Sequence, residues 1–248
     1  MTSSWGGEAR RFVLVESDCM KNDLRAIPDA EWQGPRDTAW KAIQVADYRK
    51  AIGILERVYR KYPKDNRVIS FYASTLADYG YSLPPARQEA LRKRACILLK
   101  GLLTRLRGAN PRLAYSARNE YYYHSRQHDK QYRLGVEIVQ KGNRHAYYSQ
   151  GVGAAWHAYP HAKAGRWYLA RLWARRAVLA WESLFKFHDK YYNSYVHYAL
   201  ALGILGRTKE MEAALARSAR LSGKPKTYRE FTEVRDKIAE LDVAAVKA

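Results

Sequence analysis

The chain has 248 residues, with 44 Lys and Arg against 24 Asp and Glu, so its formal net charge at pH 7 is +20. Apolar residues make up 47% of it and charged residues 27%, which is typical of a globular protein and too apolar for a disordered one. Its two cysteines, Cys19 and Cys96, are too few for a disulfide scaffold or a cysteine-based zinc site. No apolar run approaches the roughly 18 residues that a membrane-spanning helix needs.

The positive charge is unevenly distributed along the chain. Residues 1–65 hold 12 bases and 10 acids, residues 66–165 hold 16 and 5, and residues 166–248 hold 16 and 9. The excess therefore lies in the middle and C-terminal parts, where it favours an anionic partner. The alternative is that the charge serves only solubility.

The N-terminal residues lack the order of basic, apolar and small residues that marks a signal peptide. We therefore expect a cytoplasmic protein, although an export product without its leader would look the same. Strand-type alternation occurs only at Phe12–Val15, which predicts a short extended segment.

From Thr38 onward the apolar residues recur at spacings of three and four, which predicts helices almost throughout. Gly80 is expected to end its helix as a left-handed cap, Pro160 to break a helix, and Gly206 and Gly223 to end two more. Thr227 and Glu230 have the spacing of a capping box. The predicted helices, about ten, lie near residues 37–46, 51–62, 67–79, 86–106, 112–127, 130–141, 144–158, 165–187, 190–205, 208–221 and 227–241.

Short joints between these helices predict an all-α fold of antiparallel pairs. Pairs that cannot bury their apolar faces alone must stack, as in an α-solenoid. We expect an N-terminal extension at residues 1–36, helical repeats at 37–222 and a C-terminal capping helix at 223–248.

Two segments carry the same pattern of large, small and turn residues. Ile69 is followed by Tyr72, Ala73, Leu76 and Gly80, and Tyr195 is followed at the same offsets by Tyr198, Ala199, Leu202 and Gly206, then by Met211, Leu215 and Ser218. Upstream, Ala51, Leu55, Val58 and Pro63 match the second half of the pattern. The pattern resembles the tetratricopeptide repeat, with degenerate middle repeats.

This resemblance implies a right-handed solenoid whose concave groove, lined by the first helix of each pair, binds peptides or proteins without catalysis. Some members clamp a partner's terminal carboxylate with Asn, Lys and Arg on the groove helices. The helix predicted at 67–79 offers Arg67, Ser70, Ser74 and Asp78 but no Asn. Arg67 is therefore a candidate binding residue, while a clamp for chaperone tails is not expected.

The segment from Tyr115 to Lys130 is rich in tyrosine and arginine. On a helix, Tyr115, Arg118, Tyr122 and Arg126 share one face, which the repeat register is expected to point into the groove. Tyrosine and arginine together stack on planar groups and bind carboxylates or phosphates. The alternative is tyrosine packing at helix joints with the arginines extended into solvent.

Glu120, His124 and His128 also share a helical face. Two histidines and a carboxylate could bind zinc. The usual helical zinc signature, however, places its glutamate beside the first histidine and needs a third ligand, and neither feature is visible in the sequence. We therefore expect no metal and no cofactor. The two glycines of Gly151-Val152-Gly153 are too few for a phosphate loop.

The helix predicted at 165–187 provides a second candidate surface. Trp167, Ala174 and Trp181, with Leu172, Leu179 and Phe185, are interpreted as a core stripe. Arg171 and Arg175 lie one turn apart on its basic flank, where phosphate or carboxylate groups could bind.

These patterns predict a non-enzymatic binding protein for an acidic peptide or protein. The alternatives are an RNA- or DNA-binding repeat protein and a small-anion or metabolite-binding accessory protein. The candidate binding residues are Arg67, Tyr115, Arg118, Tyr122, Arg126, Arg171 and Arg175.

Overall fold

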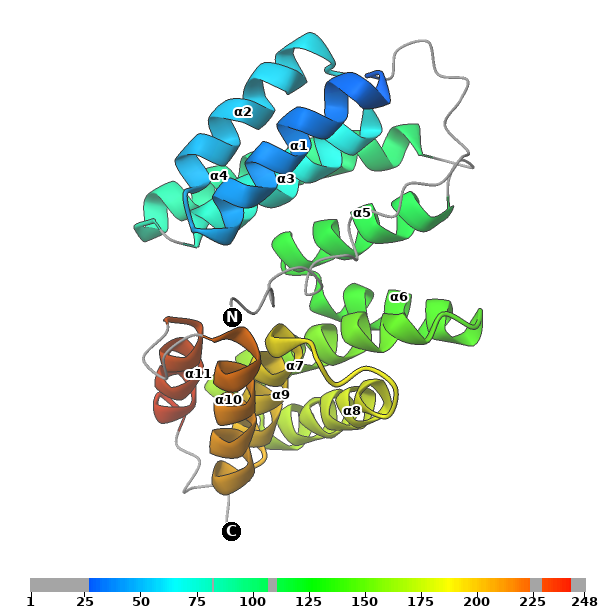
Figure 1. The fold of residues 1–248 in the computed structure, drawn as a ribbon. Helices are drawn as coiled ribbons and strands as arrows, with labels where there is room; N and C mark the ends of the chain where they lie inside the picture. The colour runs from blue at the N-terminus through cyan, green and yellow to red at the C-terminus, as the bar shows by residue number, and fades with distance from the viewer. Residues whose placement is uncertain (1–26, 82, 107–110, 224–228, 242–248) are drawn as a thin grey trace. The chain divides into compact units, whose positions relative to one another are not determined.

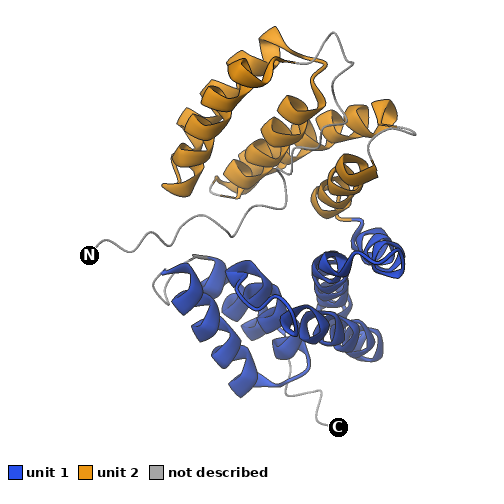
Figure 2. Cartoon of the chain, turned by 45° about the vertical axis from the view of Figure 1, so that its right-hand side comes forward, with its two compact units in different colours: residues 1–10, 127–248 blue, residues 11–126 orange. Residues whose placement is uncertain are grey.

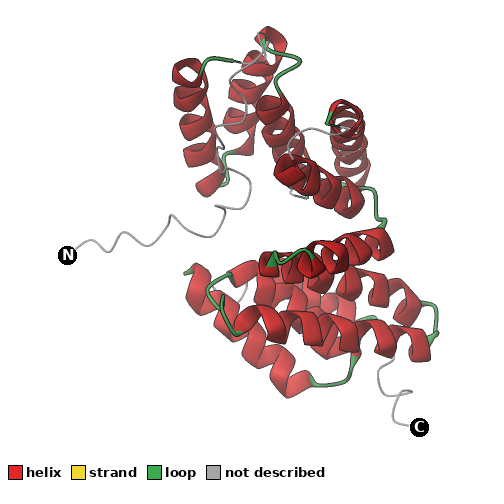
Figure 3. Ribbon diagram, turned by 90° about the vertical axis from the view of Figure 1, so that its right-hand side faces the viewer, coloured by secondary structure: helices red, strands yellow, loops and turns green. Residues whose placement is uncertain are grey.

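The computed structural model describes residues 27–81, 83–106, 111–223 and 229–241, and within them it is built from α-helices without strands (Figures 1 and 3). This confirms the prediction of an all-α fold. The expected extended segment at residues 12–15, Cys19 and Thr227 of the capping box lie outside the described residues. The helices of the described chain are α1 (Asp29–Gln44), α2 (Tyr48–Lys61), α3 (Asn66–Gly80), α4 (Pro85–Arg105), α5 (Pro111–His124), α6 (His128–Gln140), the short 3-10 helix η2 (Arg144–Ala146), α7 (Tyr147–Lys163), α8 (Trp167–Phe185), α9 (Tyr192–Ile204), α10 (Thr208–Ser222) and α11 (Arg229–Ala239).

The two largest differences from the predicted helix boundaries lie at the start of α1 and at the end of α7. Helix α1 begins at Asp29, earlier than predicted, and contains Pro35. The predicted break at Pro160 is wrong, because α7 continues to Lys163. Pro160 is exposed and near the end of α7, so the helix loses one backbone hydrogen bond there without having to bury the proline ring.

The chain divides into two compact units between Arg126 and Gln127 (Figure 2). We call the described residues 27–126 the N-terminal unit and the described residues 127–241 the C-terminal unit. The predicted division at residues 36 and 222 did not anticipate this boundary.

Helices pack in consecutive pairs within each unit. In the N-terminal unit α1 packs on α2 and α3 on α4, while α2 and α4 also contact the next helix along the chain. In the C-terminal unit α7 packs on α8 and α9 on α10, and the first helices also contact one another, α7 with α9 and α9 with α11. This is the packing of a helical repeat fold, while the right-handed solenoid stays a prediction.

Four turns between consecutive helices share a backbone geometry, three within the pairs α1–α2, α7–α8 and α9–α10 and one in the chain between α5 and α6. One residue in each adopts a left-handed conformation, with φ of 61° at Ala46, 58° at Arg126, 69° at Gly165 and 74° at Gly206. After three of these residues, the next backbone N–H donates to the carbonyl five residues before it, at 2.9 Å in each case: Asp47 to Ala42, Arg166 to His161, and Arg207 to Leu202. This is the Schellman arrangement that satisfies the last carbonyls of a helix.

A small residue precedes these turns at a fixed distance. Ala39, Ala158 and Ala199 each lie seven residues before the left-handed residue and are fully buried, and Ala73 lies seven residues before Gly80. The turn positions 46, 80, 126, 165 and 206 are thus separated by 34, 46, 39 and 41 residues. Asn119 occupies the equivalent position in α5, which makes α5 the exception.

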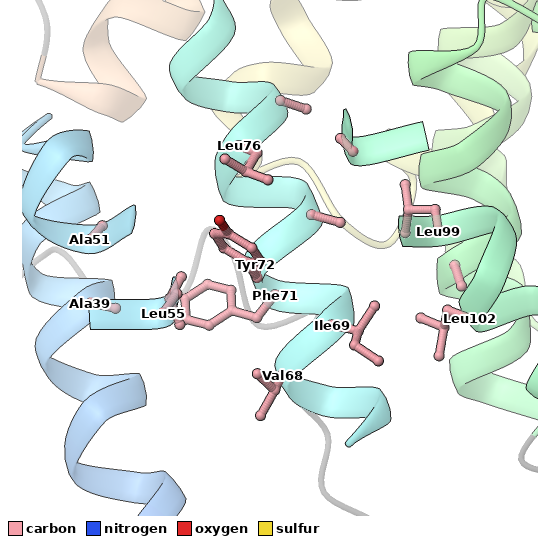
Figure 4. Close-up of a cluster of buried hydrophobic side chains, with 14 of the residues drawn as sticks. Ala39, Ala51, Leu55, Val68, Ile69, Phe71, Tyr72, Leu76, Leu99 and Leu102 are labelled. Carbon is pink, nitrogen blue, oxygen red and sulfur yellow. The ribbon is translucent and has the colours of Figure 1, made fainter. Parts of the chain in front are cut away.

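The second helix of each of four pairs buries three side chains at positions i, i+4 and i+7. Figure 4 shows several of them packed against α3 in the N-terminal unit. Small and medium-sized side chains at these positions let the paired helices approach closely. The sets are Ala51, Leu55 and the partly buried Val58 in α2, Ala95, Leu99 and Leu102 in α4, Ala170, Ala174 and Ala177 in α8, and Met211, Leu215 and Ser218 in α10.

Gly80 ends α3 for a different reason from the one expected. It is not among the glycines with positive φ, so the predicted left-handed cap is wrong. A Cβ atom at Gly80 would lie 3.3 Å from the backbone carbonyl oxygen of Gln88. The glycine therefore permits a close approach of α3 to α4. Gly206 and Gly223 follow their helices as predicted, and both adopt the left-handed conformation.

Candidate functional site

Arg67 is held in a network at the start of α3. Its guanidinium contacts the Asp29 carboxylate at 2.5 Å and the Asp65 carboxylate at 3.2 Å, and it donates to the carbonyl of Ile27 at 2.6 Å. Its side chain is only 14% exposed. Arg67 therefore joins the start of α1 to the start of α3, and we leave it out of the binding surface proposed below.

The face of α5 that carries Tyr115, Arg118, Tyr122 and Arg126 (the α5 face) belongs to the N-terminal unit. Arg118 is exposed and has no hydrogen-bond, carboxylate or aromatic partner among the described residues. Arg126 follows the helix with its side chain 72% exposed, and its guanidinium lies 3.8 Å from the Glu89 carboxylate. Tyr122 packs against Tyr121 at a ring separation of 5.9 Å.

The turn register places the α5 face differently from the expectation. Counted back from the turn residues, Tyr115, Arg118 and Tyr122 match Ile69, Tyr72 and Leu76 of α3. Those three α3 residues are buried in the N-terminal core. The register therefore gives no support for pointing the α5 face into a groove, and its arginines are candidates because they are exposed.

His124 and Glu120 form a contact on α5, as their spacing suggested. His124 Nε2 lies 3.2 Å from a Glu120 carboxylate oxygen, and the histidine is buried. Arg92 of α4 donates to the His124 carbonyl and also pairs with Glu89. These contacts fasten the end of α5 to α4. The described residues contain no cluster of three or more His, Cys, Asp or Glu side chains that could hold a metal ion.

The second candidate surface is the outer face of α8, formed by Tyr168, Arg171, Arg175 and Leu179 (the α8 face). These residues follow one another at spacings of three, four and four, so they form one stripe about 16 Å long. Tyr168 is 81% exposed and Leu179 is 63% exposed. Leu179 was predicted to be part of the core, and this is wrong, although Ala174 and Trp181 of the same predicted stripe are fully buried.

The arginines beside this stripe differ in their surroundings. Arg175 is exposed and has no interaction partner among the described residues. Arg171 is half-buried and does have an interaction partner. Arg176, on the neighbouring flank, lies over the Trp173 ring at 4.6 Å and over the Tyr132 ring at 5.9 Å. Arg175 is therefore the arginine of α8 that is most available to an external anion.

The stretch of sequence around α8 lacks acidic residues, although Lys141 and Lys163 within it pair with Glu137 and Glu240 outside it. No Asp or Glu occurs from residue 138 to residue 181, a stretch that includes all of α7 and most of α8. The same stretch carries seven bases: Lys141, Arg144, Lys163, Arg166, Arg171, Arg175 and Arg176. Elsewhere most carboxylates of the described chain are already in ion pairs, for example Glu210 with Arg207 and Glu212 with Arg235.

Both arginines of the α8 face were predicted from the sequence as binding residues, whereas its apolar members, Tyr168 and Leu179, were not. The uninterrupted absence of acids was a readable signal for this surface. The exposure of Tyr168 and Leu179 was not, because a leucine at helical spacing is more often buried.

Two comparisons with known proteins give no relative. No protein-family model matches the chain, and no curated protein matches it significantly. Among the described helices, none is both long and apolar enough to cross a membrane.

Proposed function

We propose that this chain is a non-enzymatic helical-repeat binding protein that captures an acidic peptide or an acidic segment of a protein. The observation that supports it best is the α8 face, where Arg175 lies exposed between Tyr168 and Leu179 in a stretch of chain without carboxylates. The resemblance to tetratricopeptide repeats, which are usually scaffolds, agrees with this proposal.

The chemistry of the α8 face suits a partner with both acidic and apolar side chains. Arginine binds carboxylates through paired N–H donors, and it loses less hydration than lysine does on contact. Tyr168 and Leu179 add apolar area at either end of the stripe, which a bare polyanion would leave uncovered. A peptide with Asp or Glu between large apolar residues matches both features.

Titration of a fluorescent peptide tests this proposal. The probe is an acidic peptide that contains Leu and Tyr, and its matched reference has each acid replaced by Lys. We expect saturable binding of the acidic peptide alone, and at least tenfold weaker binding by Arg175→Glu. Lys209→Glu is the control, because Lys209 is exposed on α10 of the same unit and the variant makes the same change in net charge.

Three results would overturn the proposal: no binding of the acidic peptide, equal weakening by Arg175→Glu and Lys209→Glu, or tighter binding of a random RNA oligomer with a steep salt dependence. The last result would support the nucleic-acid alternative, since phosphate contacts release counterions. Arg118→Glu tests the α5 face in the same assay.

A further inference from the structure

Two histidines on α7 bring their Nε2 atoms close together. His157 and His161 are one helical turn apart, and their Nε2 atoms lie 3.4 Å from each other. Their ring centroids are 4.9 Å apart, with the rings inclined at 78°. Both side chains are half-buried, so solvent reaches the pair.

This separation matches two ligands of one tetrahedral ion. Zinc binds histidine nitrogen at about 2.0–2.1 Å, so two nitrogens 3.4 Å apart subtend about 112° at a shared zinc ion, close to the tetrahedral angle. We propose that His157 and His161 form a two-histidine site for a divalent transition metal such as Zn²⁺. The other two positions are open to water or to carboxylates.

The His157 ring is held in place before any metal binds. It packs edge-on against Trp173 of α8 at a ring separation of 4.5 Å. Trp173 in turn contacts Tyr132 of α6 at 5.1 Å and carries the Arg176 guanidinium on its face. A ligand fixed by packing loses less rotamer freedom when it coordinates a metal.

Both imidazoles are available as neutral ligands at neutral pH. Burial lowers the pKa of His157, and the neighbouring His161 lowers it further. Burial also lowers the pKa of His161. Protons therefore compete weakly with a metal ion at pH 7.

Some charged groups around the histidine pair favour a bound cation and others oppose it. Asp129 of α6 favours a cation beside His157, whereas Arg133 of α6 and Arg166 before α8 oppose it. Arg166 also acts on His161. With two protein ligands and this mixed field, we expect weaker binding than at a four-ligand structural zinc site. Imidazole ligands suit Zn²⁺, Cu²⁺ and Ni²⁺, and exclude Mg²⁺ and Ca²⁺.

Titration of the full chain, without a histidine tag, with Co²⁺ and Zn²⁺ tests the site. We expect one Co²⁺ per chain, with visible absorption typical of low coordination number, and displacement by Zn²⁺. His157→Ala and His161→Gln should each weaken binding at least tenfold. His145→Ala is the control, because His145 is an exposed histidine of η2 that packs against Phe187 and His188.

The position of the bound ion supplies a readout that does not depend on the variants. In the wild-type protein, Co²⁺ should broaden the NMR signals of two imidazole rings, those of His157 and His161. Absence of binding, equal loss in His145→Ala, or broadening centred on other histidines would overturn the proposal. Any of these outcomes leaves the α8 face untouched, so this test and the peptide titration fail independently.

Discussion

Among single residues, His197 of α9 is a histidine whose pKa the fold lowers strongly. Its Nδ1 accepts a hydrogen bond from the Trp156 indole N–H at 3.2 Å, and its ring stacks on Trp181 at 6.4 Å. Burial, with a smaller contribution from His128, lowers the pKa of His197 to about 4. The folded chain therefore holds His197 neutral at pH values where an unfolded chain would protonate it.

We expect this histidine to make the fold acid-sensitive. An unfolded histidine takes up its proton near pH 6.5, so the contribution of neutral His197 to stability is complete above that pH and is lost as the pH falls toward 4. The shift corresponds to about 3 kcal/mol. Urea unfolding at a series of pH values measures it, and His197→Gln should flatten the profile. A variant whose profile runs parallel to that of the wild type would contradict the assignment.

Arg67 illustrates what the sequence could not show at this scale. From the sequence, Arg67 was recognisable only as a cation in the first turn of α3. Two of its partners in the structure, Asp29 and the carbonyl of Ile27, lie 38 and 40 residues away in the chain. Contacts over such separations depend on how helices pack, which spacing along one helix does not reveal. The same holds for His157 and Trp173, which come from different helices.

At the scale of helices, the two glycines near the start of α7 are explained by packing. A Cβ atom at Gly151 would lie 2.3 Å from the Trp181 ring of α8, and one at Gly153 would lie 2.6 Å from the backbone nitrogen of Tyr132 of α6. Trp181 is fully buried and has no room to move aside. These glycines let α7 lie close to both of its neighbours.

We therefore expect Gly151→Ala to destabilise the C-terminal unit by about 3 kcal/mol, since overpacking a dense core displaces side chains and backbone. The matched control is Gly101→Ala in α4, where a Cβ atom would meet nothing within 4 Å. That change should stabilise the chain by about 1 kcal/mol, because alanine is the better helix former. Urea unfolding distinguishes the two, and destabilisation by both would contradict this explanation.

The helices were the most predictable part of the fold, for physical reasons. Apolar spacing locates helix interiors, and Gly206 and Gly223 mark ends because their left-handed backbone favours glycine. The start of α1 was missed, because the apolar spacing was recognised only from Thr38 onward, whereas the helix begins at Asp29 and contains Pro35. The turns at Ala46 and Arg126 carry no glycine, so only the structure shows that they share the left-handed geometry.

For the whole molecule, each unit has its own network of tertiary contacts. In the N-terminal unit, the buried Asp65 carboxylate accepts from the backbone N–H groups of Ile27 at 2.9 Å, Arg67 at 2.8 Å and Val68 at 3.1 Å, besides its ion pair with Arg67. Asp65 thus caps α3 and ties residue 27 to it.

We expect Asp65→Ala to cost about 3 kcal/mol, because it removes a cap and leaves a largely buried guanidinium with one carboxylate fewer. Hydrogen exchange should then quicken in α3 and α4 and stay unchanged in α7 and α9. The control, Asp37→Ala, removes a carboxylate that is 48% exposed and paired with its neighbour Arg36, and it should cost less than about 1 kcal/mol. Equal loss of protection in both units would show that they unfold together.

The fixed distance from the buried alanine to the turn has a consequence for how this chain can change in length. Seven residues separate Ala39, Ala158 and Ala199 from their turns, although the repeats themselves differ by up to 12 residues. The length of this span is therefore constrained, because an inserted residue would rotate the alanine away from its partner helix by about 100°. The extra residues of the longer repeats lie outside this seven-residue span, in the joint before α4 and in the long helices α4, α7 and α8. We therefore expect this fold to accept inserted residues only in these segments. The α8 face and the histidine pair both lie on such long helices, α8 and α7.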